Sequence, residues 1–323
     1  MSRSSSRASR SDLALLFVVL VWGVNFPVLK AALAVMHPHV INIFRFAVSA
    51  LVLGGIYATR PDTWSTGFFA PLRTHLREIV LLALLGYVIY QVCFIVGVNL
   101  TTAGSAALIM AASPLWTAAI SRLAGYERLG YLAWAGLLIS LVGTGLVVVA
   151  GAESAALSGS LGGNLLMLLA SVLWGAYTAL SKTVVHAISP TGAAFFGIVV
   201  ALPFLIGVGV PYLDTVAWPE VGVWVWGAII FSGGLSTGLA FAIWNTAVKN
   251  VGASNTAVYN NLVPFIALIG GALFLNEPVA WAQLIGGALI IGGLVVMRRD
   301  RQRRVEAMDE VAREGVSALE SDR

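Results

Sequence analysis

Residues 22–30 read WGVNFPVLK, and residues 174–182 read WGAYTALSK. The two stretches share a Trp-Gly pair and a lysine, and a proline follows each lysine at the same interval, at Pro38 and Pro190. Further along the chain the correspondence continues at slightly smaller offsets. Here Asn99, Pro114, Glu127, Gly136 and Gly143 correspond to Asn250, Pro264, Glu277, Gly286 and Gly293. Self-similarity over a long, nearly fixed interval indicates that the chain is a duplicated unit.

The composition places this duplicated chain in a lipid bilayer. Of its 323 residues, 59% are hydrophobic and 11% are charged, with a mean hydropathy of +0.89, whereas soluble domains carry about 25% charged residues. Apolar runs of about 20 residues, long enough to cross the bilayer as a helix, occur ten times. They cover residues 13–34, 40–58, 79–98, 103–121, 131–150, 161–181, 191–212, 222–246, 253–274 and 279–297. The sequence therefore predicts an all-α membrane protein with ten transmembrane helices.

The placement of lysine and arginine predicts how these helices are oriented. The connections after spans 2, 4, 6 and 8 and both tails contain basic residues, whereas the connections after spans 1, 3, 5, 7 and 9 contain none. Cytoplasmic segments of membrane proteins are enriched in Lys and Arg. We therefore expect residues 1–12 and 298–323 to be cytoplasmic tails and residues 151–160 to be a periplasmic linker. The basic pI of about 9.4 then reflects orientation and attraction to anionic lipid, not nucleic-acid binding.

The N-terminal segment also resembles a secretory signal, because three arginines precede its apolar run. The Trp-Gly, Lys and Pro of this segment recur at residues 174–190, inside the chain, where no signal can lie. We therefore expect the first span to be retained.

The number of spans per repeat determines how the two copies are related. Residues 13–150 and 161–297 each contain five spans, so the second copy enters the membrane from the opposite side to the first. Inverted repeats are typical of secondary transporters, whose substrate site lies near the midplane between the copies.

Several short motifs resemble a known family. They are Trp22-Gly23 with Asn25, Ser113-Pro114, Glu127 followed by Arg128, and Asn276-Glu277-Pro278. In this order they resemble EamA-type members of the drug/metabolite transporter superfamily, over residues 13–297. The resemblance implies a ten-helix carrier of the bacterial inner membrane that exports amino acids or related metabolites. The YddG-like aromatic amino-acid exporters are the nearest functional type.

Polar and aromatic residues near the middle of the spans are the candidates for a substrate cavity, because polar groups inside a bilayer are costly unless they face a partner or a cavity. Aromatic faces would contact an apolar side chain, while amides and hydroxyls would bind amino and carboxyl groups. The predicted cavity residues are Trp22, Asn25, Arg45, Tyr87, Tyr90, Gln91, Trp174, Tyr177, Trp244, Asn245, Tyr259 and Asn260.

Two kinds of basic residue within or beside the spans have competing interpretations. Arg45 is the only arginine inside a predicted span. It either faces the cavity and attracts a carboxylate, or extends to the headgroups or bonds a helix end. Lys30 and Lys182 are expected to cap helix C-termini, which favour cations.

The sequence lacks the residues that several other functions need. All 15 Asp and Glu residues fall in loops, tails or span ends, so proton exchange through a membrane-embedded glutamate is not expected and a facilitated cycle is favoured. No glycine-rich phosphate loop, metal-ligand cluster or nucleophile paired with histidine is present. We therefore expect no enzymatic activity, no cofactor and no metal. His37 and His39 lie in an outer connection, and Cys93 is expected to be a buried thiol.

Glycines and other small residues in spans 5 and 10 predict close helix packing. These two spans are expected to brace the bundle or join protomers, leaving spans 1–4 and 6–9 to surround the cavity. The predicted function is export of amino acids, including aromatic and other apolar ones, by alternating access. The transporter is expected to be a monomer or homodimer. The alternatives are an exporter of another metabolite or drug-like compound and, more distantly, a non-transporting receptor or channel.

Overall fold

The computed structural model describes residues 2–60, 63–64, 67–126, 130–153, 160–293, 295–297 and 299–300. Within these ranges the chain is helical and contains no strand. Among the described residues, seven helices are long and apolar enough to cross a membrane, and three shorter helices are also apolar: Tyr131–Val147, Tyr259–Leu275 and Trp281–Met297. Each of the ten corresponds to one predicted span, so the predicted fold class is confirmed.

The first repeat contains five spans built from eight labelled elements. They are α1 (Ser2–Leu33), α2 (Pro38–Ala58), α5 (Leu76–Ala83), η1 (Leu84–Ile89), α6 (Tyr90–Leu100), α7 (Ala103–Met110), α8 (Ser113–Leu123) and α9 (Tyr131–Glu153). A short helix, α4 (Ala70–Thr74), lies in the connection between the second and third spans.

The second repeat has the same order of spans and ends with the helix Trp281–Met297. Its labelled elements are α10 (Ser160–Ala187), α11 (Pro190–Gly209), α12 (Val223–Ile230), η4 (Phe231–Leu239), α13 (Ala240–Val251), α14 (Ala253–Ala257), η5 (Val258–Leu262) and α15 (Val263–Leu275). The short 3₁₀ segments η2 (Val210–Thr215) and η3 (Trp218–Glu220) connect α11 to α12.

Local sequence explains where several of these helices begin and end. Pro38 and Pro190 occupy the first turns of α2 and α11, where the missing N–H costs nothing. The Ser189 hydroxyl accepts a hydrogen bond from the Gly192 N–H at 3.1 Å and so caps α11. Gly252, with φ of 89°, ends α13, a conformation that glycine adopts without steric cost.

The third and fourth spans of both repeats depart from the uninterrupted helices that the sequence predicts. Each third span contains a π-helical segment, η1 in the first repeat and η4 in the second. Each fourth span is broken just before its proline: at 111–112 before Pro114, and in the 3₁₀ segment η5 before Pro264. Proline lacks an N–H and clashes with the preceding turn, which accounts for both breaks.

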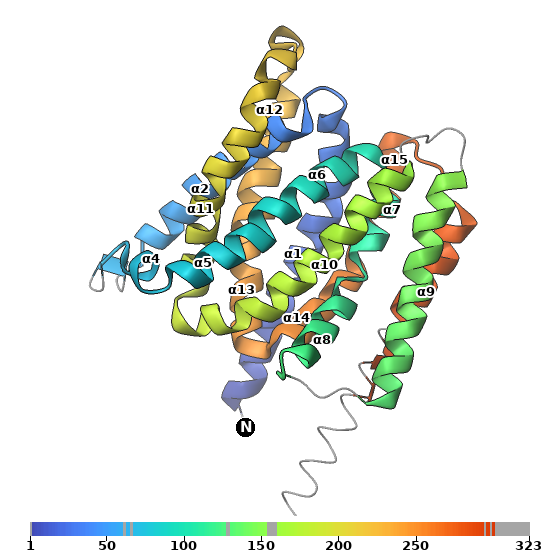
Figure 1. Cartoon of the computed structure of the whole chain (residues 1–323), viewed down its shortest axis with the longest axis horizontal. Helices are drawn as coiled ribbons and strands as arrows, with labels where there is room; N and C mark the ends of the chain where they lie inside the picture. The colour runs from blue at the N-terminus through green and yellow to red at the C-terminus, as the bar shows by residue number, and fades with distance from the viewer. Residues whose placement is uncertain are drawn as a thin grey trace, which may run out of the picture.

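The helices pack so that each repeat inserts into the other (Figure 1). The first span of each repeat packs against the fourth span of the other: α1 against α15, and α10 against α8. The second spans, α2 and α11, pack directly against each other. This reciprocal pattern is the expected consequence of inverted repeats related by a pseudo-two-fold axis. We call the end of the bundle that holds the start of α1 the inner end, following the predicted orientation, and the opposite end the outer end.

The fifth span of each repeat lies at one side of the bundle, where α9 and the helix Trp281–Met297 pair (Figure 1). Their glycines meet reciprocally, Gly136 against Gly293 and Gly143 against Gly286. The Ser140 hydroxyl donates a hydrogen bond to the Ile290 carbonyl at 3.0 Å. The close helix packing predicted for these two spans is confirmed, and the structure shows that they pack against each other.

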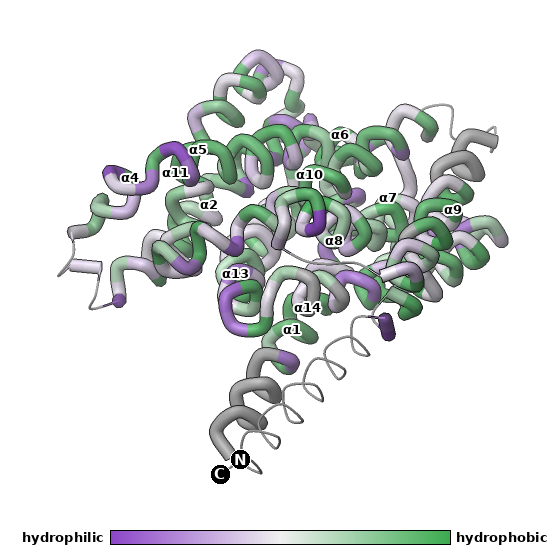
Figure 2. The backbone as a smooth tube through the Cα atoms, turned by 60° about the horizontal axis from the view of Figure 1, so that its bottom comes forward, coloured by the Kyte–Doolittle hydropathy of each residue, from purple (hydrophilic) through white to green (hydrophobic). Residues whose placement is uncertain are grey.

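The outer surface of the bundle is apolar. Figure 2 shows hydrophobic residues along the helices and hydrophilic ones gathered at turns. Large apolar side chains such as Leu51, Leu273 and Phe274 are 77%, 71% and 79% exposed. Such a surface is stable against lipid tails and would be unstable in water.

Candidate substrate site

A small central cavity of about 40 Å³ lies between the two repeats. Its wall is built from spans 1, 2, 3 and 4 of the first repeat and spans 6, 8 and 9 of the second. The lining residues are Trp22, Asn25, Phe26, Arg45, Tyr90, Gln91, Phe94, Ala107, Met110, Ala111, Trp174, Ser236, Thr237, Phe241, Asn260 and Val263. Seven of the twelve predicted cavity residues are among them: Trp22, Asn25, Arg45, Tyr90, Gln91, Trp174 and Asn260.

Arg45 is buried in the wall of this cavity, only 1% exposed. Its Nη1 donates to Asn42 Oδ1 at 3.0 Å and its Nη2 donates to Thr237 Oγ1 at 2.9 Å, while Nε has no partner among the residues that the structure describes. In the part of the chain that the structure describes, the guanidinium therefore bonds neutral groups only. Because the side chain is buried, it does not extend to the headgroups. A buried charge without a counter-ion is costly, which points to an anionic ligand.

The helix that carries Arg45 is held in place by polar contacts with both repeats. The Asn42 Nδ2 donates to the Gln91 carbonyl at 3.2 Å on α6. The Ser49 hydroxyl donates to the Gly233 carbonyl at 2.5 Å on η4. A Cβ atom at Gly233 would lie 2.5 Å from the Arg45 carbonyl oxygen, so only glycine allows η4 to approach α2 this closely.

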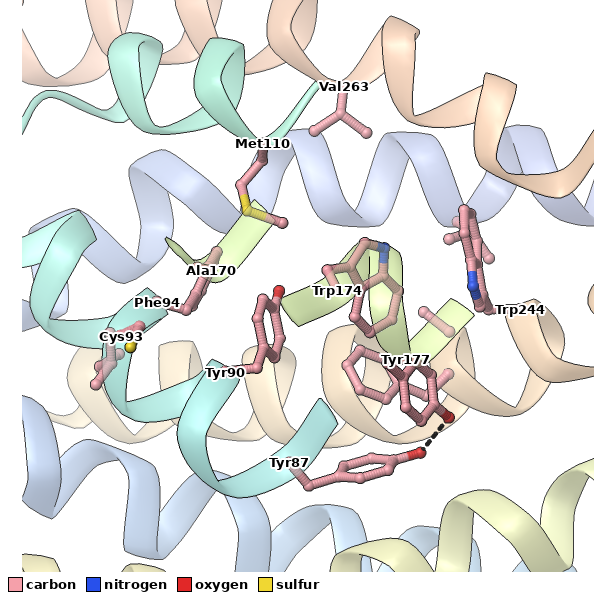
Figure 3. Packing of buried hydrophobic residues seen from close by; sticks show 14 of the residues in the cluster. Tyr87, Tyr90, Cys93, Phe94, Met110, Ala170, Trp174, Tyr177, Trp244 and Val263 are labelled. Carbon is pink, nitrogen blue, oxygen red and sulfur yellow. Dashed lines mark hydrogen bonds between the residues drawn. The ribbon is translucent and has the colours of Figure 1, made fainter. Parts of the chain in front are cut away.

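Aromatic rings form part of the cavity wall (Figure 3). The ring of Trp174 lies 5.3 Å from that of Tyr90, 5.0 Å from that of Phe241 and 5.5 Å from that of Trp22, between centroids. The Trp22 Nε1 donates to the Ser236 carbonyl at 3.0 Å. Edge and tilted contacts at these distances are favourable for aromatic pairs, so the wall is well packed.

Four other predicted residues form a buried layer next to this wall instead of lining the cavity. Tyr177 donates to Asn245 Oδ1 at 3.0 Å, which leaves Tyr87 as the donor to the Tyr177 hydroxyl at 2.7 Å (Figure 3). Trp244 packs against Trp22, with 5.0 Å between ring centroids. These four side chains are at most 1% exposed.

The two predicted residues of η5 point to different places. Asn260 lines the cavity, and its Nδ2 donates to the Ser113 hydroxyl at 3.1 Å, so it links the two broken spans. Tyr259 does not line the cavity; its hydroxyl donates to Asp12 Oδ1 at 2.6 Å, near the inner end.

Several lining residues were not predicted as site residues, notably Phe26, Ala107, Met110, Ala111 and Val263. Apolar side chains carry no signal in a sequence that is apolar throughout. Helical periodicity does point to four further lining residues, because they lie on the faces of spans 3 and 8 that carry predicted residues: Phe94, Ser236, Thr237 and Phe241.

Polar atoms in the cavity wall have hydrogen-bonding capacity to spare. Asn25 Oδ1 and Gln91 Oε1, like Arg45 Nε, are buried and have no hydrogen-bond partner among the described residues. Buried polar side chains are nearly always hydrogen-bonded. The three unpartnered atoms of Asn25, Gln91 and Arg45 belong to residues that line one cavity, which supports a site that binds a polar ligand or water.

The charged side chains of Lys30 and Glu277 at the outer end bond the ends of helices. Lys30 Nζ donates to the carbonyls of Val98 and Asn99 at 3.0 and 2.6 Å, and so caps the C-terminus of α6, as predicted. Glu277 accepts from the N–H groups of Ala103 and Gly104 at the start of α7, where the helix dipole favours an anion. Its repeat counterpart, Glu127, lies outside the described residues.

Comparison with known proteins identifies the family. The EamA-like transporter family matches residues 9–149 and 161–299. The chain belongs to the EamA-like transporter family. This EamA-like protein is therefore a multi-pass membrane transporter of the drug/metabolite transporter superfamily, with a small-molecule substrate and a lipid environment, and is not an enzyme.

Curated relatives resemble it over most of their length. The uncharacterized transporter YyaM of Bacillus subtilis is 26% identical over 274 residues, covering 84% of this chain and 88% of the relative. A protein of Streptantibioticus cattleyicolor named "probable terminal-alkyne amino-acid exporter" is 25% identical over 304 residues, covering 93% and 98%. A solved crystal structure superposes on 90% of this chain and 98% of its own, with a TM-score of 0.67 and 21% identity, and this likeness supports the fold alone.

Proposed function

We propose that this EamA-like transporter exports amino acids, including aromatic and other apolar ones, through the central cavity by alternating access. The observation that carries the proposal is the buried Arg45 guanidinium, which faces the cavity and has only neutral partners among the described residues. A carboxylate would supply the missing counter-charge through charge-assisted hydrogen bonds. An amino acid would place its carboxylate there.

The rest of the wall suits the remaining groups of such a substrate. The rings of Trp22, Tyr90 and Trp174 offer apolar faces, and aromatic faces also attract an ammonium group. The side-chain oxygens of Asn25 and Gln91, which have no partner among the described residues, could accept hydrogen bonds from an ammonium group. The relative named as an amino-acid exporter is consistent with this substrate class.

The size of the cavity supports a cycle with more than one conformation. Its volume is about 40 Å³, while sites that bind small molecules commonly measure about 300–1,000 Å³. An amino acid therefore requires the cavity to expand. Among the described residues no Asp or Glu lines it, which favours facilitated transport over proton exchange at a carboxylate.

The proposal places the protein in the bacterial inner membrane with both termini in the cytoplasm, as a monomer or homodimer. A protease-sensitive tag at either terminus should be cleaved in inverted vesicles and protected in intact spheroplasts. Cleavage of either tag in spheroplasts would contradict this orientation.

Counterflow tests the transport proposal. Liposomes that contain the purified protein and unlabelled phenylalanine should accumulate labelled phenylalanine, whereas preloading with phenylalaninamide should not drive uptake because the amide lacks a carboxylate. Arg45→Gln should lower kcat/KM about 10- to 100-fold, the loss expected when hydrogen bonds to a charged group are removed. Arg60→Gln, at an exposed position, is the matched control and should transport normally.

Other outcomes would contradict the proposal. Absence of counterflow with every amino acid, together with saturable flux of cationic dyes, would assign the protein to drug export. Flux without saturation or counterflow would indicate a channel.

A further inference from the structure

The central cavity has a charged wall and an apolar wall, on different helices. Arg45 of α2 and Thr237 of η4 form the charged wall. Ala107 and Met110 of α7, together with Ala111 directly after its last residue, form the apolar wall, and their spacing of three and four residues places them on one side of this turn. The helices α2 and α7 pack mainly against different elements: α2 against α11 and η4, and α7 against α15 and α10, while α6 contacts both. The two walls therefore lie on different sides of the cavity.

The inverted repeat does not reproduce the charged wall. At the offset that relates Pro38 to Pro190, the counterpart of Arg45 is Gly197. A Cβ atom at Gly197 would lie 2.7 Å from Cε2 of Tyr87, so the Tyr87 ring packs directly on this glycine. Among the described residues that line the cavity, Arg45 is the only cationic one, so a substrate with one carboxylate has one favourable orientation.

The apolar wall is also unique to the first repeat. At the offset that relates Pro114 to Pro264, the counterpart of Met110 is Asn260. Both residues line the cavity beside the breaks in their spans. Asn260 is tied to Ser113 by a hydrogen bond, whereas Met110 presents an apolar, unbranched side chain. Methionine has three rotatable side-chain bonds and adapts its shape to its neighbours.

We propose that the substrate binds with its carboxylate at Arg45 and its side chain against Ala107, Met110 and Ala111, and that Met110 sets the largest side chain accepted. This inference rests on the proposed amino-acid export and adds the determinant of side-chain selectivity. Figure 3 shows Met110 and Val263 on one side of the ring cluster, with Tyr90, Phe94 and Trp174 around the space below them. The flanking alanines leave the Met110 side chain as the bulkiest group of this wall.

Competition between labelled tryptophan and alanine in counterflow tests the inference. Met110→Ala should raise the ratio of kcat/KM for tryptophan to that for alanine about tenfold, because shortening the side chain enlarges the apolar end of the site. Met110→Leu conserves the volume and should leave the ratio unchanged. Met167→Ala is the matched control, because Met167 is buried against Gly97 outside the cavity; it should leave the ratio at the wild-type value whatever its effect on stability.

A second variant keeps the test decisive if Met110→Ala does not fold. Ala107→Val narrows the same wall and should lower the tryptophan-to-alanine ratio. If the wild type shows counterflow but the folded Met110→Ala and Ala107→Val variants keep the wild-type tryptophan-to-alanine ratio, the proposed role of Met110 is overturned. Amino-acid export would still stand in that case. No counterflow by the wild type with any amino acid would overturn both.

Discussion

Arg45 is costly to keep where it is. Its guanidinium is 1% exposed, and the described part of the chain supplies it with an amide and a hydroxyl but no carboxylate. Stability alone would favour an apolar residue at this position. The proposed substrate carboxylate would account for its presence, since function is a common reason for a locally unfavourable residue.

Replacing Arg45 should therefore separate function from stability. We expect Arg45→Met to abolish amino-acid counterflow while the Tm in detergent stays equal to or above that of the wild type, because the variant removes a buried charge. Thr237→Val is the opposite control: it leaves the charge buried with one partner fewer and should lower the Tm by about 2 °C or more. A lower Tm for Arg45→Met, measured by thermal unfolding in the same detergent, would indicate that the arginine mainly stabilises the fold.

At the scale of elements, the two repeats share irregularities that a pattern of apolar runs does not reveal. The π-helical segments η1 and η4 occupy corresponding third spans, and the breaks before Pro114 and Pro264 occupy corresponding fourth spans. π-Helical segments occur frequently at functional sites. Here η4 brings Thr237 to Arg45, and the breaks bring Met110 and Asn260 to the cavity wall.

The crossing of the fifth spans gives a prediction at this scale. A Cβ atom at Gly143 would lie 2.6 Å from the Gly286 carbonyl oxygen, whereas one at Gly145 on the same helix would meet nothing within 4 Å. Gly143→Leu should therefore force the helices apart and lower the Tm by about 5 °C or more. Gly145→Leu should leave the Tm unchanged or slightly raise it, because leucine favours the helix. Equal Tm values for the two variants would show that the close crossing contributes little to stability.

At the scale of the whole molecule, the two repeats are joined at the outer end by residues 101–105. The Thr101 hydroxyl donates to Asn164 Oδ1 at 2.6 Å, and Gln283 Nε2 donates to the Ser105 hydroxyl at 2.8 Å. Glu277 accepts from the start of α7 in the same region. These contacts connect the first repeat to the second. In the proposed cycle, we expect them to separate when the cavity opens toward the outer end.

A reversible cross-link tests this requirement. In a background in which Cys93, the only cysteine, is replaced by serine, Thr101→Cys combined with Asn164→Cys should form a disulfide under mild oxidation. Oxidised protein should lose counterflow, and reduction should restore it, while each single-cysteine variant transports under both conditions. Undiminished counterflow in fully cross-linked protein would contradict outer opening between these residues.

The sequence by itself determined the bilayer location, the ten spans and the inverted duplication, because helix length, hydropathy and repeated prolines and glycines are local properties of the chain. It also singled out Arg45 and the central aromatic residues, since charged and polar groups are rare in an apolar chain. Only the tertiary structure decided which of them share a cavity. Tyr87 and Asn245 bond Tyr177 next to the cavity, while Met110 and Thr237 line it. The physical reason is that π-helical turns and proline breaks rotate side chains away from regular helical positions, and the direction in which a side chain points depends on contacts with the other repeat.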